Sequence, residues 1–143
     1  MIYLDSNVFV SAALYTDVLG DRAREIVGLV ELGKVKAATS ALTYDEVFWA
    51  VKKFKGRDAA VKAGDAFLSM LNLVMVNVDR DVLYKAHELI AGSGSALDPR
   101  DAIHAACALS KGINQILSED GDFDSLNELK RSPIMGFKAS EAK

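Results

Sequence analysis

The stretch that decides the fold is MIYLDSN, residues 1–7. Its first four residues are apolar and predict a short buried strand, and the polar triplet Asp5, Ser6 and Asn7 predicts a turn. Residues 8–14 (VFVSAAL) then predict the start of a helix. A buried strand that passes directly into a helix is the first half of an α/β unit, so its recurrence along the chain would define an α/β fold.

The same alternation does recur. Apolar runs predict further strands at 35–39, 73–78, 114–117 and, at one edge, 134–137. Helical spacing of apolar residues predicts helices at 21–32, 40–55, 57–72, 80–91 and 97–109, and a short one at 124–129. A break is expected around residues 15–20 and a flexible loop at 92–95. We therefore expect an α/β protein with a mostly parallel sheet of about five strands, flanked by helices.

Composition is consistent with one folded unit. The chain has 143 residues, of which 50% are hydrophobic and 26% charged, which predicts a single domain over residues 1–138 and a disordered tail at 139–143. The single cysteine, Cys107, allows no internal disulfide and fits a reducing compartment. The start lacks a basic leader and no apolar run is long enough for a membrane span, so we expect a cytoplasmic protein without membrane contact.

Four carboxylates fall at equivalent places in this pattern. Asp5 closes the first predicted strand and Asp120 follows the fourth, while Glu46 and Asp101 lie in the first turns of predicted helices. A parallel sheet brings strand C-termini and helix N-termini to one edge, where ligands bind. Carboxylate oxygens are the ligands that Mg²⁺ prefers, and clustered carboxylates repel one another without a cation. The spacing therefore predicts a divalent-metal site.

Each acid also has a purely structural interpretation. Thr43 and Glu46 form a capping-box pattern, and Asp98 followed by Pro99 is typical of a helix start. The acids that could simply cap a helix or form a turn are Asp5, Asp120, Asp122 and Asp124. The coincidence of four acids at equivalent ends of alternating elements favours the metal site over four separate caps.

Other features point to no different chemistry. The net charge of −3 argues against nucleic-acid binding by bulk electrostatics, although a cation in an acidic site would still meet phosphate. One local basic stretch is interpreted mainly as a solvated helix end; it comprises Lys52, Lys53, Lys55, Arg57 and Lys62. His87 and His104 have no zinc spacing. His104, three residues after Asp101, could lie near the predicted site, but a position at the surface or the edge of the core is favoured.

Four stretches together carry a family resemblance. They are MIYLDSNVFVSA at 1–12, TYDEVFWAV at 43–51, LDPRDAIHAACAL at 97–109 and ILSEDGDFDSL at 116–126. In order and separation they resemble the PIN-domain family, especially the VapC-type toxins of toxin–antitoxin pairs. The resemblance implies a PIN-like three-layer sandwich over nearly the whole chain.

The resemblance also assigns residues. It places the four family acids, as catalytic and metal-binding groups, on Asp5, Glu46, Asp101 and Asp120. The supporting residues that it implies are Asn7 and Ser118, through hydrogen bonds, and Asp122, through water. Asp45 and Asp122 are the neighbouring acids that compete for the second and fourth positions.

The implied activity is that of an endoribonuclease dependent on Mg²⁺ or Mn²⁺, in which a metal-activated water cuts an RNA phosphodiester. The resemblance further implies a homodimer and a cognate antitoxin lying across the active-site groove. Phe48, Trp49 and Phe54 are candidates for that partner surface, against the alternative of plain helix core, which is favoured for Phe54.

Two other functions remain open at this point. The chain could be a catalytically inactive PIN-like module that binds RNA or protein, or an RNA-processing nuclease outside a toxin pair. Aspartyl-phosphate phosphatases and receiver domains fit worse, because Asp5, Ser6 and Asn7 supply only one acid after the first strand.

Overall fold

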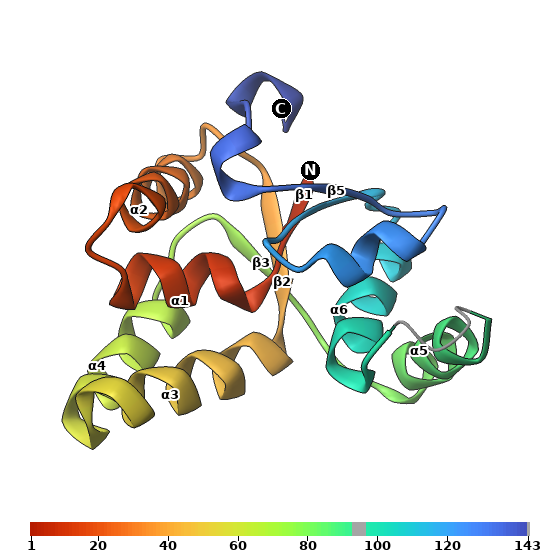
Figure 1. Ribbon diagram of the computed structural model, residues 1–143, viewed down its shortest axis with the longest axis horizontal. Helices are drawn as coiled ribbons and strands as arrows, with labels where there is room; N and C mark the ends of the chain where they lie inside the picture. Colours follow the sequence, from red (N-terminus) through yellow and green to blue (C-terminus); the bar gives the residue numbers. More distant parts are fainter. Residues whose placement is uncertain (93–96, 143) are drawn as a thin grey trace.

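The computed structural model describes residues 1–92 and 97–142 (Figure 1). Their centre is a five-stranded sheet in the order β3-β2-β1-β4-β5, in which every pair of neighbours is parallel. The strands are β1 (Ile2–Leu4), β2 (Ala37–Ser40), β3 (Leu73–Val76), β4 (Gln115–Leu117) and β5 (Lys130–Ser132). The predicted α/β class and parallel sheet are confirmed.

Helices cover both faces of the sheet. The α-helices within the described residues are α1 (Ser6–Leu14), α2 (Val18–Glu31), α3 (Ala41–Lys55), α4 (Arg57–Leu68), α5 (Arg80–Gly92) and α6 (Pro99–Ser110). In Figure 1, α1 to α4 lie on one side of the strands and α5 and α6 on the other, which confirms the three-layer arrangement. None of the helices in this part of the chain is long and apolar enough to cross a membrane. The loop predicted at 92–95 falls almost wholly outside the described residues.

The alternation of side chains along the strands builds two cores. Ile2 and Leu4 pack into the core beneath α1 to α4, while Tyr3, between them, packs into the core beneath α5 and α6. In β2 the neighbours Ala37 and Ala38 divide in the same way. Because successive side chains of a strand point to opposite faces, a fully apolar strand needs helices on both sides.

The C-terminal predictions were wrong in two elements. A short 3-10 helix, η1 (Gly121–Ser125), replaces the helix expected at 124–129, and the fifth strand is β5 rather than residues 134–137. Those residues contain another 3-10 helix, η2 (Ile134–Gly136). The physical reason is that the Ile134 side chain packs into the core from a 3-10 helix. An apolar residue at this position therefore does not indicate a strand. The charged segment Lys130–Ser132 pairs with β4 at the edge of the sheet instead.

The tail predicted to be disordered is also packed as far as residue 142. Residues Ala139–Glu141 form the 3-10 helix η3, and Ala142 is fully buried against the core beneath α1 to α4. The Ala142 carbonyl accepts a hydrogen bond from the Lys36 N–H at 3.1 Å, just before β2 begins. Although its sequence is mostly polar, this segment packs against the core through Ala139 and Ala142 and forms a backbone hydrogen bond beside β2.

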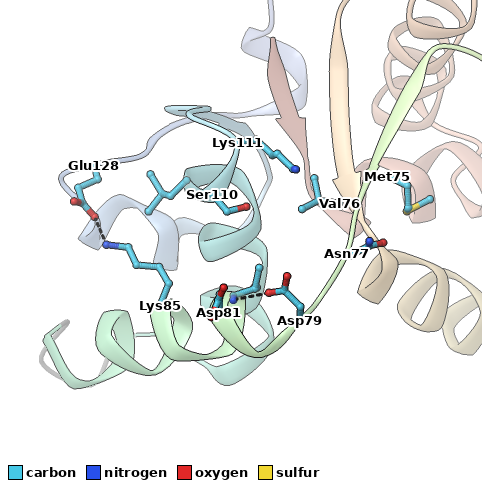
Figure 2. Close-up of a pocket in the computed structure, with 11 residues that line it drawn as sticks. Met75, Val76, Asn77, Asp79, Asp81, Lys85, Ser110, Lys111 and Glu128 are labelled. Atoms are coloured by element: carbon cyan, nitrogen blue, oxygen red, sulfur yellow. Dashed lines mark hydrogen bonds and ion pairs between the residues drawn. The ribbon is translucent and has the colours of Figure 1, made fainter.

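A hollow of mixed charge lies where β3 ends, beside α5 and the C-terminal end of α6 (Figure 2). Three of its charged groups have local partners: Lys85 lies 3.4 Å from Glu128, and Asp79 accepts a hydrogen bond from the Val82 N–H at 2.9 Å. The Asp79 contact caps the start of α5. This hollow contains none of the four acids expected to bind metal.

Candidate active site

Asp5 lies at the point where β1 passes into α1, and its side chain is almost completely buried, with 4% exposed. One carboxylate oxygen accepts the Ser6 N–H at 2.7 Å, which caps α1. The other accepts the Asn7 amide at 2.8 Å and the Ser118 hydroxyl at 2.6 Å. The predicted cap at Asp5 is confirmed, and Asn7 and Ser118 hold the carboxylate in one orientation.

Glu46 reaches the same place from α3. The capping box expected at Thr43 was wrong, because α3 begins two residues earlier, at Ala41, and the Thr43 hydroxyl instead forms a hydrogen bond of 2.7 Å with the hydroxyl of Thr39. The Glu46 carboxylate instead reaches the start of α1, where it accepts the Ser6 hydroxyl at 3.1 Å. Its neighbour Asp45 is exposed and lies outside these contacts.

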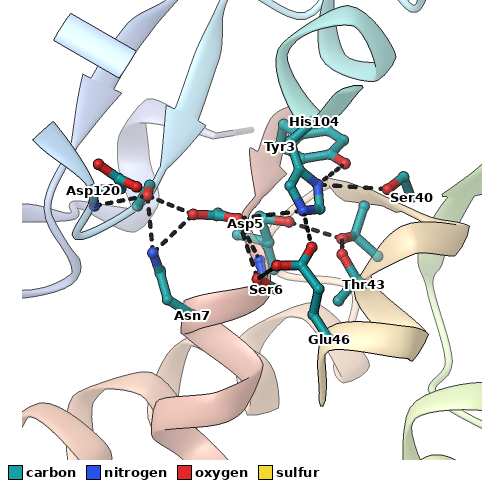
Figure 3. A network of polar contacts seen from close by, with 12 residues as sticks. Tyr3, Asp5, Ser6, Asn7, Ser40, Thr43, Glu46, His104 and Asp120 are labelled. Atoms are coloured by element: carbon teal, nitrogen blue, oxygen red, sulfur yellow. Dashed lines mark hydrogen bonds and ion pairs between the residues drawn. The ribbon is translucent and has the colours of Figure 1, made fainter. Parts of the chain in front are cut away.

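His104 is the residue that the sequence interpretation misplaced. It has no exposed surface, and its Nε2 lies 2.5 Å from a Glu46 oxygen and 3.6 Å from Asp5 Oδ1. A hydrogen bond of 2.8 Å joins its Nδ1 to the Tyr3 hydroxyl. Figure 3 shows Asp5 with Asn7 and Asp120 on one side and the imidazole and Glu46 on the other. The only sequence signal was its position three residues after Asp101, one turn along a helix rich in alanine.

His104 and Glu46 each stabilise the charged form of the other. Burial opposes the charged form of His104, but the hydrogen bond to Glu46 and the negative charges of Asp5 and Glu46 raise its pKa above the ordinary value. Burial acts against the charged form of Glu46 too, yet the hydrogen bond with His104 and the imidazolium charge lower its pKa. The two residues therefore form an ion pair in which His104 is buried and Glu46 is partly buried.

Asp101 and Asp120 face each other across the end of the sheet. Asp101 lies in the first turn of α6, behind Asp98 at the N-cap and Pro99, as predicted. Asp120 is positioned by its N–H, which donates to the Ser118 hydroxyl at 3.0 Å, and it caps η1 by accepting the Asp122 N–H at 2.9 Å. One carboxylate oxygen from each of Asp101, Asp120 and Asp122 lies within 4.8 Å of the other two.

In the cluster of Asp101, Asp120 and Asp122, like charges lie close together. Burial, then the negative charges of Asp120 and Asp5, raise the pKa of Asp101 to about 7. Hard divalent cations take several carboxylate oxygens, so the donor set and its mutual repulsion fit a Mg²⁺ or Mn²⁺ ion. A hollow opens onto the cluster and is lined by Glu46, Asp98, Pro99, Arg100, Asp101 and Asp120. The structure thus brings all four predicted acids to one edge, with Asp122 beside Asp120.

The fold and this carboxylate cluster define an α/β protein with a candidate cation site, and the comparisons give its family. The PIN domain matches residues 2–129, a range that contains every carboxylate of the site. The chain therefore belongs to the PIN-domain family. A comparison with curated proteins gives no sequence match.

Solved structures have the same fold. The VapC20 toxin of Mycobacterium tuberculosis, which cleaves the sarcin–ricin loop, is 21% identical with a TM-score of 0.72, covering 87% of this chain and 94% of its own. VapBC2 of Rickettsia felis, bound to a promoter DNA fragment, is 20% identical with a TM-score of 0.72, covering 93% and 98%. A toxin–antitoxin complex from Klebsiella pneumoniae is 18% identical with a TM-score of 0.64, covering 90% and 95%.

Proposed function

We propose that this chain is a divalent-metal-dependent endoribonuclease and the toxin of a toxin–antitoxin pair. The observation that carries the proposal is the convergence of oxygens from Asp101, Asp120 and Asp122 within 4.8 Å, beside the buried Asp5. A carboxylate cluster this tight is costly unless a cation occupies it. Membership of the PIN family and the likeness to an RNA-cleaving toxin support RNA as the substrate.

Each carboxylate has a distinct part in the proposed reaction. Asp5, Asp101 and Asp120 would hold Mg²⁺ or Mn²⁺, and Asp122 would assist through water. The bound ion would supply the charge that polarises the phosphate and lowers the pKa of the attacking water. Asn7 and Ser118 keep the Asp5 carboxylate oriented, since both donate to the same oxygen. Water adds to phosphorus and the bond to the 3′-oxygen breaks, which leaves a 5′-phosphate and a 3′-hydroxyl.

Glu46 takes a different role from the three aspartates. Glu46 and Asp5 both accept hydrogen bonds on both oxygens, but the negative charge of Glu46 is paired with His104 at 2.5 Å, against 3.6 Å for Asp5. Glu46 nevertheless lines the same hollow as Asp101 and Asp120, and a carboxylate oxygen can accept more than one hydrogen bond. We therefore assign Glu46 to orienting the attacking water rather than to holding the ion directly.

The proposed partners are a cognate antitoxin and a second copy of the chain. An antitoxin is supported by the likeness to toxin–antitoxin assemblies such as the Klebsiella pneumoniae complex. An apolar hollow on the α1 to α4 side offers surface for a partner; its lining includes Phe9, Val27, Phe67 and Met70. The homodimer rests on the family resemblance.

The test uses purified protein and a mixed single-stranded RNA pool with Mg²⁺, with Mn²⁺ or with EDTA. Cleavage should require metal and disappear in Asp5→Asn, because that variant loses a charge at the ion. The matched control is Asp58→Asn, an exposed acid in the first turn of α4, which should cleave like the wild type. Absence of both cleavage and Mg²⁺ or Mn²⁺ binding by calorimetry would contradict the proposal and leave a PIN-like binding module.

A further inference from the structure

We propose that a second hollow beside the carboxylates is a nucleobase-binding site for single-stranded RNA, with Trp49 as its stacking surface. This inference rests on the proposed ribonuclease function, because it states how the same RNA is held next to the cut. The hollow is lined by Leu42, Asp45, Glu46, Trp49 and Arg100.

The two hollows are continuous through shared residues. Glu46 and Arg100 line this hollow and also the hollow that contains Asp101 and Asp120. In this proposal, a strand whose phosphate lies at the carboxylates has its neighbouring base in the hollow that Trp49 lines. This continuity is the reason to assign the surface to the substrate itself.

The chemistry of the lining suits a base better than a phosphate. Trp49 is 59% exposed on α3, and Lys53 Nζ lies over its ring, so a base would stack on the face that Lys53 does not cover. The carboxylates of Asp45 and Glu46 repel an anion, whereas they accept hydrogen bonds from the amino groups of a base. Arg100 adds a planar guanidinium that can stack or donate. A planar, uncharged group rich in hydrogen-bonding edges satisfies all of these side chains.

The rest of the helix face suits the sugar–phosphate backbone. Lys53 lies one turn beyond Trp49, with its Nζ 5.0 Å from the centroid of the indole ring. Glu46, Trp49 and Lys53 are spaced by three and four residues, so they follow one face of α3 over roughly 10 Å. The order along that face is carboxylate, aromatic ring and cation, which matches a cut phosphate, a stacked base and a neighbouring phosphate.

The first experiment uses the fact that Trp49 is the only tryptophan of the chain. Intrinsic fluorescence is followed while a short single-stranded oligoadenylate is added to the full chain in EDTA, where no metal-dependent cleavage occurs. Stacking should quench the emission in a saturable way. An abasic strand of equal length, which keeps the phosphates and lacks the bases, should leave the emission unchanged.

The second experiment measures affinity for the same oligoadenylate, carrying a fluorescein label, by anisotropy. Trp49→Ala should weaken binding about tenfold, and Trp49→Phe should retain most of the affinity because a smaller ring still stacks. Phe54→Ala is the matched control: Phe54 is 71% exposed on the same helix, lies near Lys53 and does not line the hollow. It should bind within about twofold of the wild type.

The outcomes separate this inference from the nuclease proposal. Unchanged emission, or equal affinities for Trp49→Ala and Phe54→Ala, would overturn the nucleobase site even if the wild type cleaves RNA, and would leave the surface to a protein partner. Quenching with the expected loss of affinity, but no cleavage with Mg²⁺ or Mn²⁺, would keep the site and remove the nuclease.

Discussion

Two charged hollows of this chain differ in how their charges are balanced. In the hollow at the end of β3, Lys85 pairs with Glu128 and Asp79 caps α5, so these charged groups have local partners. At the other, Asp101 and Asp120 face each other, and burial with the charges of Asp120 and Asp5 raises the pKa of Asp101. The difference teaches that a charged lining alone does not mark a site; what marks it is a set of like charges that the fold leaves uncompensated.

The largest expected difference between the hollows is in catalysis. Asp101→Asn should lower RNA cleavage by at least about a hundredfold, because it removes an ion-binding charge worth several kcal/mol of transition-state stabilisation. Asp81→Asn, in the first turn of α5 and on the lining of the other hollow, should stay within about twofold. Initial rates with Mg²⁺ measure both. Circular dichroism should show an unchanged fold, and a parallel loss of helix in Asp101→Asn would favour the capping role instead.

The next difference is in stability. His104→Ala should lower the free energy of unfolding by about 3 kcal/mol, because it leaves the Glu46 carboxylate without its buried partner. Lys85→Ala breaks only the exposed pair with Glu128 and should cost less than about 1 kcal/mol. Urea unfolding compares them, and His104→Gln separates the lost charge from the cavity. Equal losses in His104→Ala and Lys85→Ala would contradict the ion pair.

The smallest difference is in the pH dependence of the metal-free protein. The raised pKa of Asp101, about 7 against an ordinary 3.8, means that its protonated form is favoured in the folded state. Its stabilising contribution is therefore present below pH 3.8 and is lost as the pH rises to about 7. Asp101→Asn should flatten this loss and be more stable than the wild type by about 1 kcal/mol at neutral pH.

The measurement is urea unfolding in EDTA across that pH range, with and without added Mg²⁺. Mg²⁺ should stabilise the wild type at neutral pH more than it stabilises Asp101→Asn. His104 also loses its stabilising contribution as the pH rises, and Asp101 is one of the charges that raise the pKa of His104. The comparison of the two proteins therefore measures the contribution of Asp101 together with its coupling to His104. Parallel pH curves for wild type and variant would show that the carboxylates do not repel one another.

Local patterns predicted the positions of the aspartates better than their contacts. Asp5 and Asp120 follow strands that are recognisable from their apolar runs, so the edge on which they meet could be predicted. For Glu46 the capping-box pattern was misleading, because Thr43 lies inside α3, where its hydroxyl contacts Thr39 of β2, and the Glu46 carboxylate contacts His104. Phe54, expected in the core, is exposed on α3, since the helix packs through its other faces.

Other features could not be predicted because they depend on long-range contacts. The strand β5 has the charged sequence Lys130–Ser132, and nothing apolar identifies it. Arg131 is held by two hydrogen bonds to Asp124, at 2.9 and 2.8 Å, and by one to the Ser118 carbonyl at 3.0 Å. These contacts tie the edge strand to the acidic loop, and they exist only once β4 and β5 are adjacent.

By itself, the sequence determined the alternation of strands and helices, the parallel sheet and the edge at which the acids gather, because periodicity and strand ends are local properties of the chain. Only the tertiary structure decided that His104 is buried and that it contacts Glu46 and Tyr3. It also decided which carboxylate oxygens lie within 4.8 Å of one another, those of Asp101, Asp120 and Asp122. The physical reason is that burial and pKa depend on contacts between residues far apart in the chain, such as Tyr3 and His104. A local sequence pattern does not indicate such contacts.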